Sequence, residues 1–127
     1  MSGVVVDTSA WIEFFAGREV PGLEDALAAG QIVLAPVVVE AGQRAPTASG
    51  REKISALVAD FAVHETPVGH WIRVAEPRRR LNARGLSIST PDPHVAQCAL
   101  DRDAHLLARD QIFSHIAKLE PLKLIAG

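Results

Sequence analysis

Three short, unbroken apolar runs place the strongest constraint on how this chain folds. They are Val4–Val6, Ile32–Leu34 in the predicted strand Gln31–Leu34, and Leu106–Ala108 in the predicted strand His105–Ala108. Each is too short for a typical helix and lacks the polar alternation of a half-exposed strand, so each predicts a buried strand. Longer segments with helical spacing separate them, as crossovers between parallel strands require. We therefore expect an α/β fold with a mainly parallel central sheet and helices on both faces.

The expected helices follow from apolar spacing and from glycine and proline near their ends. We place them at 11–15, 23–29, 51–61, 68–84, 93–100 and around 112–116, with a last strand at 122–125. Thr8 or Ser9 should cap the first helix, and Pro77 should kink or interrupt the fourth. Residues 44–50 are the one plausible loop insertion.

The segment Val37–Glu40 is ambiguous. Three consecutive valines favour a strand, whereas Pro36 immediately before them favours the first position of a helix. Propensity alone predicts a strand.

Composition limits the chain to one compact domain, which we expect to span residues 1–127. The 127 residues are 48% hydrophobic, yet no window approaches the roughly 18 to 20 apolar residues that cross a bilayer. The N-terminus lacks the pattern of a signal peptide, and the lone Cys98 excludes an internal disulfide. We expect a cytoplasmic protein in which Cys98 is a small core residue.

Aspartates follow two of the predicted strands. Asp7 comes directly after Val6 and Asp110 shortly after Leu107, so both should lie at the carboxyl edge of the sheet, where ligands bind in such folds. Asp92 stands at a helix start between two prolines. Each also has a structural interpretation: Asp7 in a capped turn, and Asp92 and Asp110 as helix caps.

Carboxylates gathered in a small volume repel one another, and a hard cation with oxygen ligands relieves that repulsion. We expect Mg²⁺ or Mn²⁺ here. Zinc is disfavoured at these acids because they have no histidine or cysteine at suitable spacing. Such a cluster activates water and neutralises a phosphodiester, so the implied chemistry is phosphate ester hydrolysis.

The chain resembles the PIN-domain family, and within it the VapC-type toxin ribonucleases, along nearly its whole length. The resemblance is carried by 4–12, 36–40, 90–100 and 106–113. It implies a PIN-like fold, with the ambiguous valines on a helix. It also implies a homodimer, a small VapB-type antitoxin partner and an RNA substrate.

Position by position, the resemblance implies an acidic site of Asp7, Glu40, Asp92 and Asp110, which would be both catalytic and metal-binding. Thr8 or Ser9 would hydrogen-bond to the carboxylates and so orient them, without binding the metal directly. Ile112 stands where many relatives have a further acid, so a second metal should be held weakly. His94 is expected to be a partly exposed histidine at a helix start, with contact to substrate or water as the alternative.

The net charge of the chain is compatible with RNA binding but is not evidence for it. The net charge is −2, but setting the four site acids aside leaves 11 acids against 13 bases. Arg78, Arg84 and Arg109 are the main candidates for RNA contact, although most such arginines are ordinary surface residues.

Apolar side chains on two predicted helices suggest a groove for an amphipathic antitoxin segment. These are Phe14, Phe15, Ile54, Leu57, Val58 and Phe61. Two rival functions remain: an RNA-processing PIN nuclease without an antitoxin, and a catalytically inactive PIN binding module.

Overall fold

The computed structural model describes residues 3–125, so the expected 1–127 domain extends beyond the described residues at both ends. The strands are β1 (Val4–Val6), β2 (Ile32–Leu34), β3 (Ala62–Val63), β4 (His105–Leu107) and β5 (Lys123–Ile125). The helices are α1 (Thr8–Phe15), α2 (Pro21–Ala28), α3 (Pro36–Gln43), α4 (Ala48–Asp60), α5 (Val68–Ala83), α6 (Pro91–Asp101) and α7 (Ile112–Ala117).

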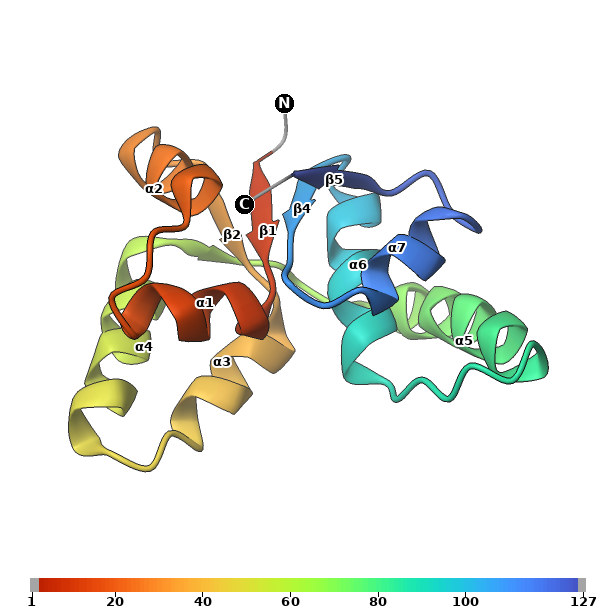
Figure 1. Ribbon diagram of the computed structural model, residues 1–127, viewed down its shortest axis with the longest axis horizontal. Helices are drawn as coiled ribbons and strands as arrows, with labels where there is room; N and C mark the ends of the chain where they lie inside the picture. Colours follow the sequence, from red (N-terminus) through yellow and green to blue (C-terminus); the bar gives the residue numbers. More distant parts are fainter. Residues whose placement is uncertain (1–2, 126–127) are drawn as a thin grey trace.

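The sheet is parallel throughout, in the order β3-β2-β1-β4-β5. β1 is the central strand, and Val4, Val5 and Val6 pair with His105, Leu106 and Leu107 of β4. In Figure 1, helices α1 to α4 lie to the left of the central strands and α5 to α7 to the right. The expected α/β class with a parallel sheet is confirmed.

The core surrounds the three central strands. β1 and β2 are buried at every position, as their unbroken apolar sequences predict. Helix α6 packs on β1 and β4 and is buried from Pro93 to Ala99, which includes Cys98. Helix α5 packs along α6. Since α6 carries Asp92 near its start, the core holds that end of the helix in place.

The ambiguous valines are helical, as the family resemblance implies and against their propensity. Pro36 occupies the first turn of α3, and only Val38 of this helix is fully buried. Packing of α3 against α1, α4 and α6 outweighs the weak intrinsic preference of valine for strands.

Two expectations about the middle of the chain need correction. Helix α5 runs through Pro77 without interruption, because its buried side packs on α6 and this contact offsets the hydrogen bond that proline removes. Helix α4 begins at Ala48, so the connecting loop is shorter than 44–50. The two-residue strand β3 was not predicted, since both of its side chains are exposed and it has no apolar run.

Among residues 3–125, no helix is both long enough and apolar enough to span a membrane.

Candidate metal-dependent active site

Asp7 and Asp110 lie at the carboxyl edge of the sheet, as predicted. The backbone amide of Asp7 donates to the carbonyl of Leu107 at 2.9 Å, which joins the ends of β1 and β4. In Figure 1 both strands lead down to the region where α1 and α6 begin. Two acids more than one hundred positions apart in the sequence are thereby brought to neighbouring strand ends.

Asp92 joins them from the first turn of α6. Thr90, not Asp92, is the residue at the N-cap, so the capping interpretation of Asp92 is not what the structure shows. Burial and, to a lesser extent, the negative charges of Asp7 and Asp110 together raise the pKa of Asp92 to about 6. Asp7 and Asp110 thus lie near enough to Asp92 for their charges to disfavour its ionised form.

Ser9 fixes the orientation of Asp7. Its hydroxyl donates to Oδ2 of Asp7 at 2.7 Å and accepts from the backbone amide of Arg109 at 3.0 Å. Asp7 itself is the N-cap of α1 and accepts from the amide of Ser9, so the cap is neither Thr8 nor Ser9. Ser9 therefore ties the Asp7 carboxylate to the segment that follows β4. Thr8 is partly exposed and lines a neighbouring pocket.

Asp110 is exposed, and its Oδ1 accepts from the amide of Ile112 at 3.0 Å. It is thus anchored at the start of α7 while it remains open to solvent. The side chain of Ile112 is only partly buried.

Glu40 lies on α3 and is engaged in an ion pair. Its carboxylate pairs with Arg44 one helical turn later, with 2.9 Å between Nε and Oε1. Both side chains are more than half exposed, so the pair is worth little energetically and a rotamer change would release it.

The three candidate arginines for RNA contact have different surroundings. Arg109 pairs with Glu13 at 2.8 Å. Arg78 donates from Nε to the carbonyl of Ile88, which fixes the loop before α6. Arg84 is exposed at the C-cap of α5. Arg78 therefore has a structural task that the sequence did not indicate.

His94 is buried, with 1% of its surface exposed, so the expectation of a partly exposed histidine is wrong. The cause is the packing of α5 on α6, which covers this side of the helix. Its Nδ1 lies 2.8 Å from Nε2 of His70, whose Nδ1 lies 3.1 Å from Asp101. The amide of Val37 approaches its Nε2 at 3.4 Å.

This chain of contacts assigns the tautomers. Hydrogen bonds from Arg73, Gln97 and His70 lower the pKa of Asp101 to about 2 against the opposing effect of burial, so Asp101 is an acceptor. His70 then donates from Nδ1 and accepts at Nε2 from His94. The remaining lone pair of His94 faces the amide of Val37 in α3. A polar path through the core thus connects Asp101 with the helix that carries Glu40.

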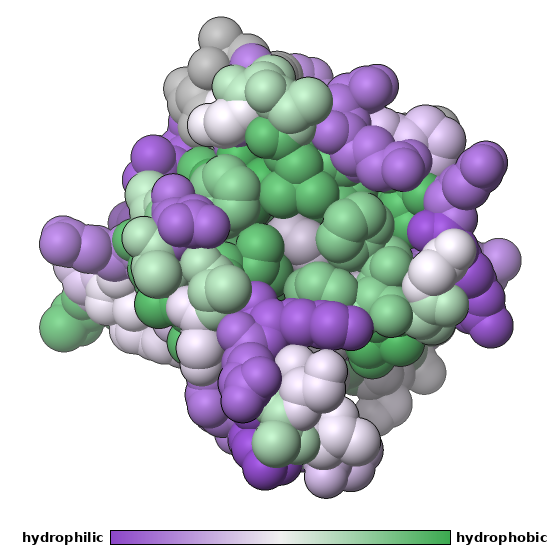
Figure 2. All heavy atoms as spheres, turned by 90° about the vertical axis from the view of Figure 1, so that its left-hand side faces the viewer, coloured by the Kyte–Doolittle hydropathy of each residue, from purple (hydrophilic) through white to green (hydrophobic). Residues whose placement is uncertain are grey.

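An apolar pocket of about 500 Å³ lies between α1, α3 and α4. Figure 2 shows the corresponding side of the molecule, where apolar side chains gather in a hollow with hydrophilic ones at its margins. Of the predicted groove residues, Phe15 and Ile54 line the pocket. Phe14, Leu57, Val58 and Phe61 instead pack partly buried against the core. Ile12, 62% exposed, was missed, although its place one turn before Phe15 was a usable signal.

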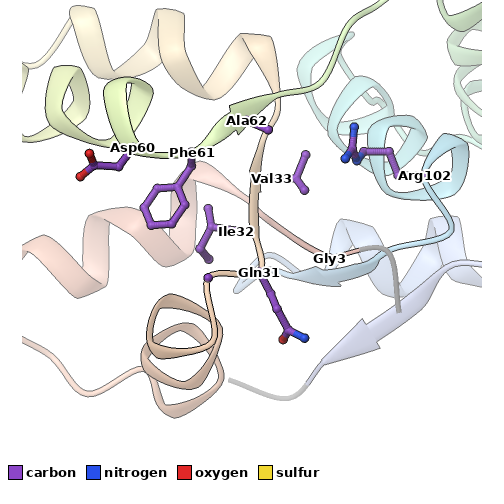
Figure 3. A pocket seen from close by; sticks show the side chains of 9 residues that line it. Gly3, Gln31, Ile32, Val33, Asp60, Phe61, Ala62 and Arg102 are labelled. Atoms are coloured by element: carbon purple, nitrogen blue, oxygen red, sulfur yellow. The ribbon is translucent and has the colours of Figure 1, made fainter.

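A second hollow, of about 320 Å³, lies at the opposite edge of the sheet. Gly3 and Gln31–Val33 line it at the amino ends of β1 and β2, as Figure 3 shows together with Phe61 and Arg102. It is therefore separate from the acids, which follow the carboxyl ends.

Comparisons with known proteins agree with the fold. The family model described as the PIN domain matches residues 4–119. Structures of VapBC2 from Rickettsia felis bound to a promoter DNA fragment and of DNA-bound VapBC from Salmonella typhimurium are similar, with TM-scores of 0.77 and 0.74. Identities are 14% and 12%, with 96% and 98% of each chain covered. VapBC-5 from Mycobacterium tuberculosis is 20% identical over the full length of both chains, with a TM-score of 0.70. No curated protein matched the chain.

Proposed function

The chain belongs to the PIN domain family, and from this premise we propose that it is a metal-dependent endoribonuclease of the VapC type, the toxin of a toxin–antitoxin pair. The observation that carries the proposal is that Asp7 and Asp110 follow the carboxyl ends of the paired strands β1 and β4, near enough to Asp92 for their charges to raise its pKa. The similarity in fold to VapBC complexes supports the toxin role.

The donor set fits Mg²⁺ or Mn²⁺. It consists of carboxylate oxygens, which hard cations prefer, and it carries an excess of negative charge that a cation would neutralise. Asp7 and Asp92 are the proposed direct ligands, with Asp110 and Glu40 completing the acidic set. When bound, the ion supplies Lewis acidity and an activated water for attack on a phosphodiester.

The residues around the acids have defined tasks in this proposal. Ser9 holds Asp7 in one rotamer, and the amide of Ile112 holds Asp110. Glu40 reaches the other acids only after it leaves Arg44. Arg84 and Arg109 contact RNA phosphates beside the acids, and Arg78 contributes indirectly by fixing the loop that precedes Asp92.

The pocket between α1, α3 and α4 is the proposed docking site for a VapB-type antitoxin. Its apolar lining suits the buried face of an amphipathic segment, and Arg44 lies at its margin beside Glu40. A bound segment would thus extend toward the acids and block them. We further propose that the protein acts in the cytoplasm as a homodimer.

The decisive experiment is cleavage of total RNA with Mg²⁺ or Mn²⁺, with and without chelator, by the parent and by Asp7→Asn. Asp25→Asn, which changes an exposed acid on α2, is the matched control. We expect cleavage by the parent and the control only when the metal is present, and none by Asp7→Asn. Cleavage that persists in excess chelator would overturn the metal-dependent mechanism.

The same experiment separates the rivals. A purified parent that binds RNA but cleaves none with either ion would be an inactive PIN binding module. A parent that cleaves RNA, but whose gene has no antitoxin neighbour and whose induction does not arrest growth, would be an RNA-processing nuclease. Mapping the cleavage sites after brief induction would identify the RNA.

A further inference from the structure

A second group of potential metal ligands lies away from the acids, where α5, α6 and the segment after β3 meet. His64, His70 and Cys98 each offer one ligand atom, and these atoms lie within 4.8 Å of one another. His70 and Cys98 are completely buried, while His64 is partly buried. The three come from separate elements, so the fold and not the local sequence brings them together.

The two ring nitrogens of His64 are the unusual feature. Both are enclosed, and neither has a hydrogen-bond partner in the structure. A buried imidazole normally satisfies at least one nitrogen, because an unpaired polar group inside a protein costs about 1–3 kcal/mol. His64 is nevertheless held in place, since its amide donates to the carbonyl of Leu34 at 2.8 Å and extends the pairing of β3 with β2. An imidazole fixed beside a thiol and a second imidazole is suited to a metal.

We propose that His64, His70 and Cys98 form a binding site for Zn²⁺ or a similar borderline divalent cation. Two imidazole nitrogens and one sulfur are the donors that such cations prefer over the oxygen set of the acidic site. Zinc binds nitrogen at about 2.0–2.1 Å and thiolate sulfur at about 2.3 Å, so tetrahedral ligands lie about 3.5 Å apart. Side-chain movements of about 1 Å would therefore close the site around the ion. The fourth position would be taken by water or by a neighbouring side chain.

Asp101 supplies the support that metal-binding histidines usually have. It accepts from Nδ1 of His70 at 3.1 Å and is itself held by Gln97 and Arg73. A carboxylate behind the ring fixes the tautomer and leaves Nε2 of His70 with the lone pair that a cation needs. In the metal-free protein that lone pair faces His94 at 2.8 Å, so the ion would replace one hydrogen bond.

The protonation states set the cost of binding. Burial, followed by Arg102 and His70, lowers the pKa of His64, which keeps its ring in the neutral form that binds metals. Burial raises the pKa of Cys98 to about 12, so its sulfur carries a proton until an ion arrives. Coordination breaks the S–H bond, forms the metal–sulfur bond and releases the proton to solvent.

Such an ion would stabilise the fold and would not take part in RNA cleavage. It would connect the edge strand β3 and the first turn of α5 with the middle of α6. The inference is independent of the proposed function, because none of its three ligands belongs to the acidic set.

Cobalt distinguishes this site from the acids, since only a bond from Co²⁺ to a thiolate gives sulfur-to-metal charge-transfer absorption. We expect that absorption when purified, metal-free protein is titrated with Co²⁺, saturating at one equivalent and lost on addition of Zn²⁺. Asp7→Asn should keep it, and Cys98→Ala should lose it. Absence of the absorption in the parent would overturn the proposal.

Zinc affinity gives a second, quantitative test. Cys98→Ala and His64→Gln should each weaken Zn²⁺ binding more than about a hundredfold. Mutation of residues that only hydrogen-bond to metal ligands typically weakens binding by less, about 10- to 100-fold. His115→Gln on α7 is the matched control and should bind as the parent does. His64 is only partly buried, so its variant remains informative if Cys98→Ala fails to fold. Parent-like zinc affinity in a folded ligand variant would overturn the assignment.

Discussion

The hydroxyl of Ser9 donates to Oδ2 of Asp7 at 2.7 Å and accepts from the amide of Arg109, so Ser9 joins the first acid of the proposed site to the segment after β4. Without it, the Asp7 carboxylate would rotate more freely and meet a cation in more than one geometry. Residues that hydrogen-bond to metal ligands typically contribute about 10- to 100-fold to metal affinity or activity.

The first prediction concerns this bond. Ser9→Ala should lower kcat/KM for RNA and the affinity for Mn²⁺ by about 10- to 100-fold, with little change in thermal stability. Ser55→Ala, at an exposed serine on α4, is the matched control. A loss of stability that parallels the loss of Mn²⁺ affinity would instead make Ser9 a structural residue.

The second prediction concerns the stability of Asp92→Asn. At pH 7 in metal-free buffer, the charge on Asp92 near Asp7 and Asp110 destabilises the folded parent, and the variant lacks this charge. The free energy of unfolding should rise by about 1–2 kcal/mol, less than the full change in pKa implies because solvent screens the carboxyl. RNA cleavage should disappear. A variant that melts below the parent would show that Asp92 has a structural role.

The third prediction is the pH dependence of that difference. The folded pKa of Asp92, about 6, lies above its usual 3.8, so the folded protein binds the proton more tightly than the unfolded chain. This residue therefore lowers the parent's stability as pH rises from about 4 to about 6, and the variant lacks that contribution. Denaturant unfolding at a series of pH values should show the two proteins converging at acidic pH. A difference independent of pH would contradict the assignment.

The fourth prediction concerns the apolar pocket. Ile12→Ser should weaken binding of the antitoxin at least tenfold, about 1.4 kcal/mol, while RNA cleavage by the free protein is retained. Ile72→Ser on α5 is closely matched, because the two isoleucines are 62% and 68% exposed. Titration calorimetry and a cleavage assay measure the two properties separately. Equal binding by both variants would place the antitoxin elsewhere.

The fifth prediction concerns the contact of α3 with α4. A Cβ built on Gly42 would overlap the side chain of Ile54, so Gly42→Ala should cost about 1–3 kcal/mol of stability. Gly69→Ala in α5 is the control, since its Cβ would meet only the flexible end of Arg73. Thermal unfolding distinguishes them. A neutral Gly42→Ala would mean that the two helices separate easily.

Much of the sheet, and the positions of Asp7 and Asp110 after buried strands and of Asp92 at a helix start, could be predicted because their signals are local. An apolar run that ends at Asp7 indicates both a buried strand and the edge at which the acid lies. The helical conformation of Val37–Val39 could not be predicted from the local sequence, since it depends on packing against three other helices. Family resemblance supplied what propensity could not.

The remaining errors also arise from tertiary contacts. His94 is buried because α5 covers α6, and nothing in the sequence around His94 indicates that cover. The approach of His64 and Cys98 likewise depends on how β3 joins the sheet, and β3 has only two exposed residues. The role of Glu40 as a site residue stays a prediction, and in the structure its carboxylate pairs with Arg44 of the same helix.

The pairing of β1 with β4 also sets a time order during protein synthesis. Asp7 leaves the ribosome among the first residues, but its neighbour Asp110 and the strand that holds it follow about a hundred residues later, at roughly 5–20 residues per second. A nascent or prematurely terminated chain that lacks β4 has no assembled carboxylate cluster. Under the proposed function, RNA cleavage would therefore become possible only after almost the whole chain has emerged from the ribosome.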